Sequence, residues 1–252
     1  MKKLVILIGL AASAACSGGK NGAVTLSARL GAPNGQALTT ANGAAQVASG
    51  IEVTRVRVVI RNLRLEREDD KTETKFAKGP LLLDVKGSDL GGALVQLLVD
   101  TKVPAGTYDK LKLEIHTIES APLPEFKELV DQGVSLLIEG TIDTKPFTFA
   151  SALEAELEHE GRFQLGGTAN NITLNIDASK WFTAADGSRL SPVDTTATAR
   201  EAILANIRSS FSAFEDDDED GEKDEVEDGG IDDGDHGEAD AGDHGEHDGG
   251  HG

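Results

Sequence analysis

The chain has 252 residues, of which 44 are acidic and 24 are basic, so its formal net charge is −20 at pH 7. This length allows one large domain or two small ones. The single cysteine excludes a disulfide within the chain. The protein must therefore fold around a hydrophobic core. The negative charge and the lack of a basic stripe argue against nucleic acid as a partner.

Residues 1–15 have the composition of a secretory signal peptide. Lys2 and Lys3 precede an apolar run over residues 4–12, which is the order of charged and apolar regions in such signals. The run is too short to cross a bilayer as a helix. We therefore expect an exported protein.

The signal ends in Ser13-Ala14-Ala15-Cys16, which resembles the lipobox of bacterial lipoproteins, although Ser13 stands where leucine is commonest. The resemblance implies that Cys16 is lipidated and that residues 16–22 form a tether to the membrane. Ser17 implies, by likeness to the enterobacterial sorting rule, an outer-membrane location that faces the periplasm or the cell surface. Ordinary cleavage after Ala14 or Ala15 is the alternative.

Residues 23–182 have the pattern of an antiparallel, immunoglobulin-like β-sandwich. Short alternating segments separated by Gly, Pro and Asp turns predict strands at 23–30, 51–67, 81–85, 108–118, 134–142, 147–157, 162–165 and 172–176. Residues 31–50 are predicted as a long loop, 68–78 as a hairpin-like connection, and 121–132 as a linker with a turn of helix. The pattern of residues 90–99 fits either a helical turn or an extended segment.

The long strand at 51–67 carries two further signals. Its apolar residues change parity near Arg61 and Asn62, which predicts a β-bulge that keeps the later apolar residues facing inward. Its other face carries arginines, which either meet the acidic C-terminal segment or form a solvated surface. They are Arg55, Arg57, Arg61, Arg64 and Arg67.

Part of this region resembles a known family. The segments Leu83-Asp84-Val85, 103–108 (VPAGTY), 111–115 (LKLEI) and 171–177 (NITLNID) resemble a domain of unknown function that is common in bacterial surface lipoproteins. The resemblance covers residues 24–177. It implies an immunoglobulin- or transthyretin-like sandwich with an N-terminal lipid anchor, and it adds no catalytic residue.

Residues 183–214 are predicted to form a turn followed by an amphipathic helix that docks on the sandwich. Thr198-Ala199-Arg200-Glu201 has the spacing of a capping box, in which Thr and Glu satisfy each other's backbone donors. Apolar side chains then follow at helical spacing, namely Ile203, Leu204, Ile207, Phe211 and Phe214.

Residues 215–252 hold almost half of the chain's 44 acidic residues and one basic residue, Lys223, and we expect this tail to be disordered. Its start also matches a calcium-binding loop, in which alternate carboxylates, a glycine and a closing Glu surround the ion. The candidate ligands are Asp216, Asp218, Asp220, Glu222 and Glu227, with Gly221 at the turn. The alternative is a solvated acidic run, because Lys223 stands at a normally apolar position and no second helix follows.

The end of the tail contains four candidate ligands for transition metals. Gly-Asp-His-Gly-Glu occurs twice, and the histidines are His236, His244, His247 and His251. Imidazole with carboxylate suits Zn²⁺, Ni²⁺ or Cu²⁺, but ligands on a glycine-rich chain must be ordered on binding, which predicts weak affinity.

The sequence contains no GxSxG elbow, no phosphate-binding GxxxxGK(S/T) loop and no HExxH helix. His116 is predicted at a strand end and His159 in a turn. We therefore expect a non-enzymatic, lipid-anchored envelope protein, with a binding or structural role, whose acidic tail binds divalent cations, most simply Ca²⁺. The membrane and an unidentified protein or glycan are the other expected partners. The alternative is a lipoprotein that buffers or delivers Zn²⁺ or Ni²⁺ through its histidines.

Overall fold

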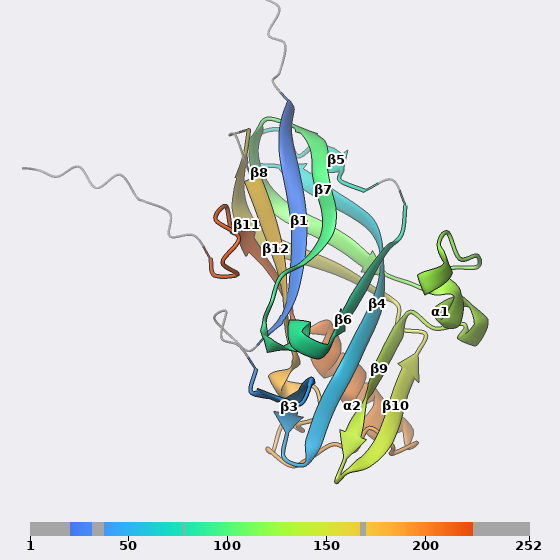
Figure 1. Cartoon of the computed structure of the whole chain (residues 1–252). Helices are drawn as coiled ribbons and strands as arrows, with labels where there is room; N and C mark the ends of the chain where they lie inside the picture. Colours follow the sequence, from blue (N-terminus) through green and yellow to red (C-terminus); the bar gives the residue numbers. More distant parts are fainter. Residues whose placement is uncertain (1–20, 32–37, 78, 167–169, 224–252) are drawn as a thin grey trace, which may run out of the picture.

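The strands form two sheets in the computed structural model, which describes residues 21–31, 38–77, 79–166 and 170–223 (Figure 1). The four-stranded sheet has the order β13 (Phe211–Glu215), β12 (Asn170–Asp177), β1 (Asn21–Gly31) and β7 (Val95–Pro104). The prediction of a mainly β protein with sandwiched sheets is confirmed. The antiparallel prediction needs one correction, because β1 and β12 are parallel, whereas the other paired strands among the described residues are antiparallel.

The nine-stranded sheet is built around β4 (Ile51–Arg67), which runs along much of the molecule in Figure 1. The other members are β2 (Thr40–Ala41), β3 (Ala44–Ala48), β5 (Glu73–Lys75), β6 (Leu81–Lys86), β8 (Gly106–Ile115), β9 (Leu136–Ile142), β10 (Lys145–Ser151) and β11 (Ala155–Leu165). Along one side β4 pairs first with β9 and then with β8, and along the other with β3, β6 and β5.

The predicted bulge in β4 is confirmed. The register against β8 shifts between Arg61 and Arg64, and Asn62 takes a positive φ of 48°, which Asn tolerates better than most residues. Ile60 before the bulge and Leu63 and Leu65 after it are consequently all buried. The core between the sheets also takes in Tyr108, whose hydroxyl donates a 2.7 Å hydrogen bond to the Pro104 carbonyl oxygen and closes the turn before β8.

Two segments differ from the sequence-based expectation, and the structure resolves a third, residues 90–99, into both of the forms that the sequence left open. The segment 31–50, predicted as a loop, contains the β2–β3 hairpin. Its buried side chains are the small residues Ala44, Ala45 and Val47, which give a weak strand signal in the sequence. Residues 90–99 hold the end of a 3-10 helix (Gly87–Gly91) and the start of β7. The strands predicted at 147–157 and 162–165 are instead β10 and one continuous β11. β10 pairs with β9 and β11 pairs with β8, and the buried Leu153 lies in the link between β10 and β11.

The helices are short and pack on separate parts of the sandwich. A 3-10 turn (Pro124–Phe126) and α1 (Lys127–Gln132) realise the predicted turn of helix, and Phe126 and Leu129 pack against Val59 and Val134 in a small second core. A further 3-10 turn (Ala178–Lys180) follows β12. None of the helices in the described part of the chain is long and apolar enough to cross a membrane.

The C-terminal helix, α2 (Ala197–Arg208), buries Ile203, Leu204 and Ile207, as predicted. Its start was placed wrongly, because Thr196 is the N-cap and its side chain accepts a hydrogen bond from the Ala199 amide at 3.4 Å. Its end was also wrong, because Phe211 and Phe214 lie on β13. Their spacing suits either element, and pairing with the edge of β12 satisfies the backbone groups of the strand.

Four of the five arginines of β4 meet carboxylates of other segments rather than the described part of the acidic tail. The ion pairs are Arg55 with Asp84 (2.7 Å), Arg57 with Glu128 (2.7 Å), Arg64 with Glu73 (3.2 Å) and Arg67 with Asp69 (3.0 Å). The prediction of a solvated arginine face is therefore wrong for Arg57, whose exposed fraction is 2%, because α1 covers it with Glu128.

The close approach of β9 to β4 predicts a severe effect for Gly140→Ala. A Cβ at Gly140 would overlap the Glu52 carbonyl oxygen and lie 2.9 Å from Cε1 of Phe147, so strands must separate to admit it. We expect the free energy of unfolding to fall by about 1–3 kcal/mol in urea denaturation. Gly79→Ala is the matched control, since its Cβ meets nothing within 4 Å. Equal stability of the two variants would contradict the packing described.

Candidate metal site

The start of the acidic segment forms a loop against the four-stranded sheet. Asp216 follows β13 directly, and its amide donates to the Asn171 carbonyl oxygen at 3.1 Å, which continues the pairing with β12. The chain then reverses through Glu219 (φ 57°) and Gly221 (φ 83°). Gly221 is needed for its positive φ and for space, since a Cβ there would overlap the Arg29 guanidinium.

Asp216 is fully buried, which corrects the expectation of a disordered, solvated tail for this residue and for the buried Gly221. Its Oδ2 accepts a 2.6 Å hydrogen bond from the Thr173 hydroxyl, and the Gly221 amide lies 3.2 and 3.1 Å from its two carboxylate oxygens. Burial raises the pKa of Asp216, and the bonds from Thr173 and Gly221 act in the opposite direction.

A chain of buried polar groups leads from this carboxylate into the sheet. The Ser27 hydroxyl donates to Asn171 Oδ1 at 2.9 Å, and Asn171 Nδ2 donates to the Thr173 hydroxyl at 3.0 Å. Arg29 is 3% exposed and donates from Nη1 to the Gly221 carbonyl oxygen. Burial lowers the pKa of Arg29, while the charges of nearby acids, Asp216 foremost, raise it.

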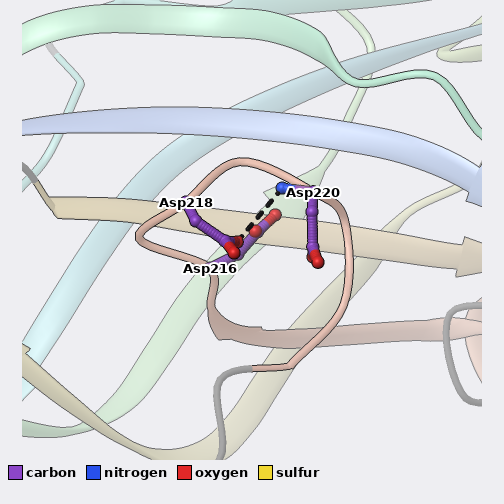
Figure 2. Close-up of side chains that lie close together, drawn as sticks. All are labelled: Asp216, Asp218 and Asp220. Atoms are coloured by element: carbon purple, nitrogen blue, oxygen red, sulfur yellow. Dashed lines mark hydrogen bonds between the residues drawn. The ribbon is translucent and has the colours of Figure 1, made fainter.

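The loop brings three of the predicted ligands together. Asp216, Asp218 and Asp220 each offer one carboxylate oxygen, and these oxygens lie within 4.8 Å of one another (Figure 2). The Asp220 amide donates to Asp218 Oδ1 at 3.3 Å, drawn in Figure 2, and the Glu222 amide donates to Asp220 Oδ1 at 2.7 Å. These backbone bonds hold the alternate carboxylates in place, as the spacing predicts.

The remaining predicted ligands are placed differently. Glu222 is exposed and does not belong to the cluster of described residues. Glu227, Cys16 and the tail histidines His236, His244, His247 and His251 lie outside the described residues. The expected helix before the loop is a strand, so the loop is not the helix–loop–helix unit of an EF-hand.

The supporting residues Arg29, Asn171 and Thr173 were not identified from the sequence. Alternation along residues 23–30 places Ser27 and Arg29 on the face opposite the core, and the pattern of a half-buried strand predicts that this face is exposed. Both are buried in the structure, and the later acidic loop contacts Arg29 through the Gly221 carbonyl oxygen. A polar residue on a strand next to an acidic segment is too common a pattern to reveal this contact.

The two histidines that precede the tail, His116 and His159, lie elsewhere. His116 follows β8, as expected, and its Nε2 lies 3.3 Å from Glu154 Oε1. His159 lies within β11 rather than in a turn, and burial lowers its pKa. Neither is part of the carboxylate cluster.

The cluster could hold a metal ion through oxygen ligands. Three carboxylates suit a hard cation such as Ca²⁺, which takes 6–8 oxygens, including backbone carbonyls and water. Because a carboxylate binds a cation in its deprotonated form, the raised pKa of Asp216 makes cation and proton competitors at this position.

Comparisons with known proteins found one similar solved structure and assign no function to these residues. No family model and no curated protein match the chain. Among solved structures, MbnP from Methylosinus trichosporium is similar to it, with 15% sequence identity and a TM-score of 0.40, over 77% of this chain and 98% of that chain. A likeness at this level carries no argument about function.

The contact between Thr173 and Asp216 predicts a measurable loss of stability on Thr173→Val. This substitution keeps the shape of the side chain but removes a donor to a buried carboxylate, so we expect a loss of about 1–3 kcal/mol in urea unfolding. Thr141→Val is the control, because its hydroxyl reaches only an exposed carboxylate of Glu52 at 3.5 Å. Equal losses in both variants would mean that the loop is not held by this contact.

Proposed function

We propose that this chain is a non-enzymatic, lipid-anchored protein of the cell envelope whose Asp216–Asp218–Asp220 loop binds a divalent cation, with Ca²⁺ preferred. The observation that carries the proposal is the convergence of three carboxylate oxygens within 4.8 Å in a loop fixed to the sheet. Export and lipidation rest on the signal-like N-terminus and on Cys16. The sandwich presents the loop, and a protein or glycan ligand of its surface remains unassigned.

The fixed start of the loop favours binding because it lowers the entropic cost of assembling the ligands. Asp216 is held by Thr173 and by the Gly221 amide before any ion arrives. One carboxylate oxygen of Asp216 lies within 4.8 Å of a carboxylate oxygen from each of the exposed Asp218 and Asp220. A flexible acidic run would have to order all three residues on binding, at about 1–2 kcal/mol of backbone entropy for each.

The preference for Ca²⁺ over Zn²⁺ or Ni²⁺ follows from the ligand chemistry. The cluster offers oxygen alone, which suits Ca²⁺ and Mg²⁺, whereas imidazole nitrogen favours Zn²⁺ and Ni²⁺. Mg²⁺ demands near-ideal octahedral geometry and holds its water firmly, so an irregular loop with three carboxylates selects the larger ion.

Calorimetric titration of Ca²⁺ into the full-length protein tests the proposal. We expect one saturable site, and Asp218→Asn should weaken it at least about tenfold. Glu219→Gln is the matched control, because it removes the same charge from the same loop without removing an oxygen from the cluster. Ca²⁺ affinity should also fall as pH is lowered towards the raised pKa of Asp216.

Three results would contradict the proposal. Weak, non-saturable heat would leave the loop as a solvated acidic run. Equal weakening by Asp218→Asn and Glu219→Gln would show that only overall charge matters. Stronger binding of Zn²⁺ or Ni²⁺ that Asp218→Asn does not change would favour the rival function, metal buffering by the tail histidines.

A further inference from the structure

Arg61 differs from the other arginines of β4 that share its side of the strand. Arg55, Arg57, Arg64 and Arg67 each form an ion pair with a carboxylate. Within the described part of the chain, Arg61 has no carboxylate within 4.0 Å of its guanidinium. A cationic side chain without a counter-charge on a charge-paired sheet is available for a ligand.

The bulge in β4 explains why Arg61 lacks a partner. Glu114 on β8 stands opposite Arg61 in the register of the two strands. The left-handed backbone of Asn62 turns its side chain toward this carboxylate, and Asn62 Nδ2 donates to Glu114 Oε2 at 2.6 Å. The other oxygen of Glu114 lies 3.6 Å from Arg64 Nη2. Glu114 is therefore engaged by the residues that follow the bulge.

The neighbours of Arg61 use little of its hydrogen-bonding capacity. Its Nη1 lies 3.3 Å from the Thr117 carbonyl oxygen and 3.4 Å from His116 Nδ1. His116 Nδ1 is itself 2.8 Å from the same Thr117 oxygen, which fits an Nδ1–H donor rather than an acceptor for Arg61. Of the five guanidinium N–H groups, most remain able to bind a ligand.

Arg61 lines a surface hollow of about 530 Å³, which is within the size range of small-molecule sites. Its other lining residues include His116 and Glu119 as polar groups, and Pro80, Ile118 and Pro122 as apolar ones. The hollow therefore combines a fork of cationic donors with an apolar wall. Glu119, and Glu154 beside His116, place negative charge close by.

We propose that this hollow binds a small organic acid that carries one carboxylate and an apolar body. The guanidinium of Arg61 pairs with the carboxylate through two parallel N–H donors, a geometry that Arg matches and Lys does not. Pro80, Ile118 and Pro122 contact the apolar body. The nearby carboxylates repel a doubly charged phosphate more strongly than a single carboxylate, which favours a ligand with one negative charge.

The test uses N-acetyl-leucine as the probe, titrated into the full-length protein and followed by NMR chemical shifts. We expect saturable binding with a Kd of about 0.1–1 mM, weakened at least about tenfold by Arg61→Gln. Arg61→Lys keeps the charge but loses the fork, and it should weaken binding to an intermediate extent. Arg55→Gln is the matched control, because it removes a β4 arginine that is already paired, with Asp84, and does not contact Glu114.

Two probe controls distinguish a carboxylate site from weak apolar or general anion binding. The methyl ester of N-acetyl-leucine keeps the apolar body and loses the charge, and inorganic phosphate does the opposite, so neither should saturate the hollow. Unchanged amide shifts outside the hollow would show that Arg61→Gln remains folded. Failure of N-acetyl-leucine to saturate, or equal affinity in wild type and Arg61→Gln, would overturn the proposal.

Discussion

Burial of both faces of β12 is the constraint on which the candidate site depends. Alternate residues of this strand, such as Ile172 and Leu174, pack into the core, while Asn171 and Thr173 are buried on the opposite face. Buried polar groups require partners. The acidic loop supplies one through Asp216, and the sheet in return fixes the first carboxylate of a potential cation site.

The arginines of β4 fall into two groups, those that are paired with an acid and the one that is not. On β4 nearly all the arginines are neutralised by acids on adjacent elements, so they hold strands together without offering a site. Where the bulge at Asn62 withdraws Glu114, one arginine faces a hollow. The loop of Asp218 follows a strand of the four-stranded sheet, whereas Arg61 lies on the nine-stranded sheet.

Features governed by local periodicity were predictable from the sequence. The long strand β4, its bulge at Asn62 and the grouping of Asp216, Asp218 and Asp220 all follow from residue spacing. Features decided by tertiary pairing were not. Phe211 and Phe214 fit a helical face, yet the open edge of β12 takes them as a strand. The burial of Arg29 and Arg57 depends on segments distant in sequence.

Hydrogen exchange of the Gly221 amide, measured in the full-length protein without added cation, tests the central claim most directly. The account holds that this amide is bonded to the buried carboxylate of Asp216 before any metal binds. Exchange slower by about 100-fold or more than in an unstructured chain is therefore predicted. Exchange at the unstructured rate would contradict the account, because the loop would then not be fixed to the sheet.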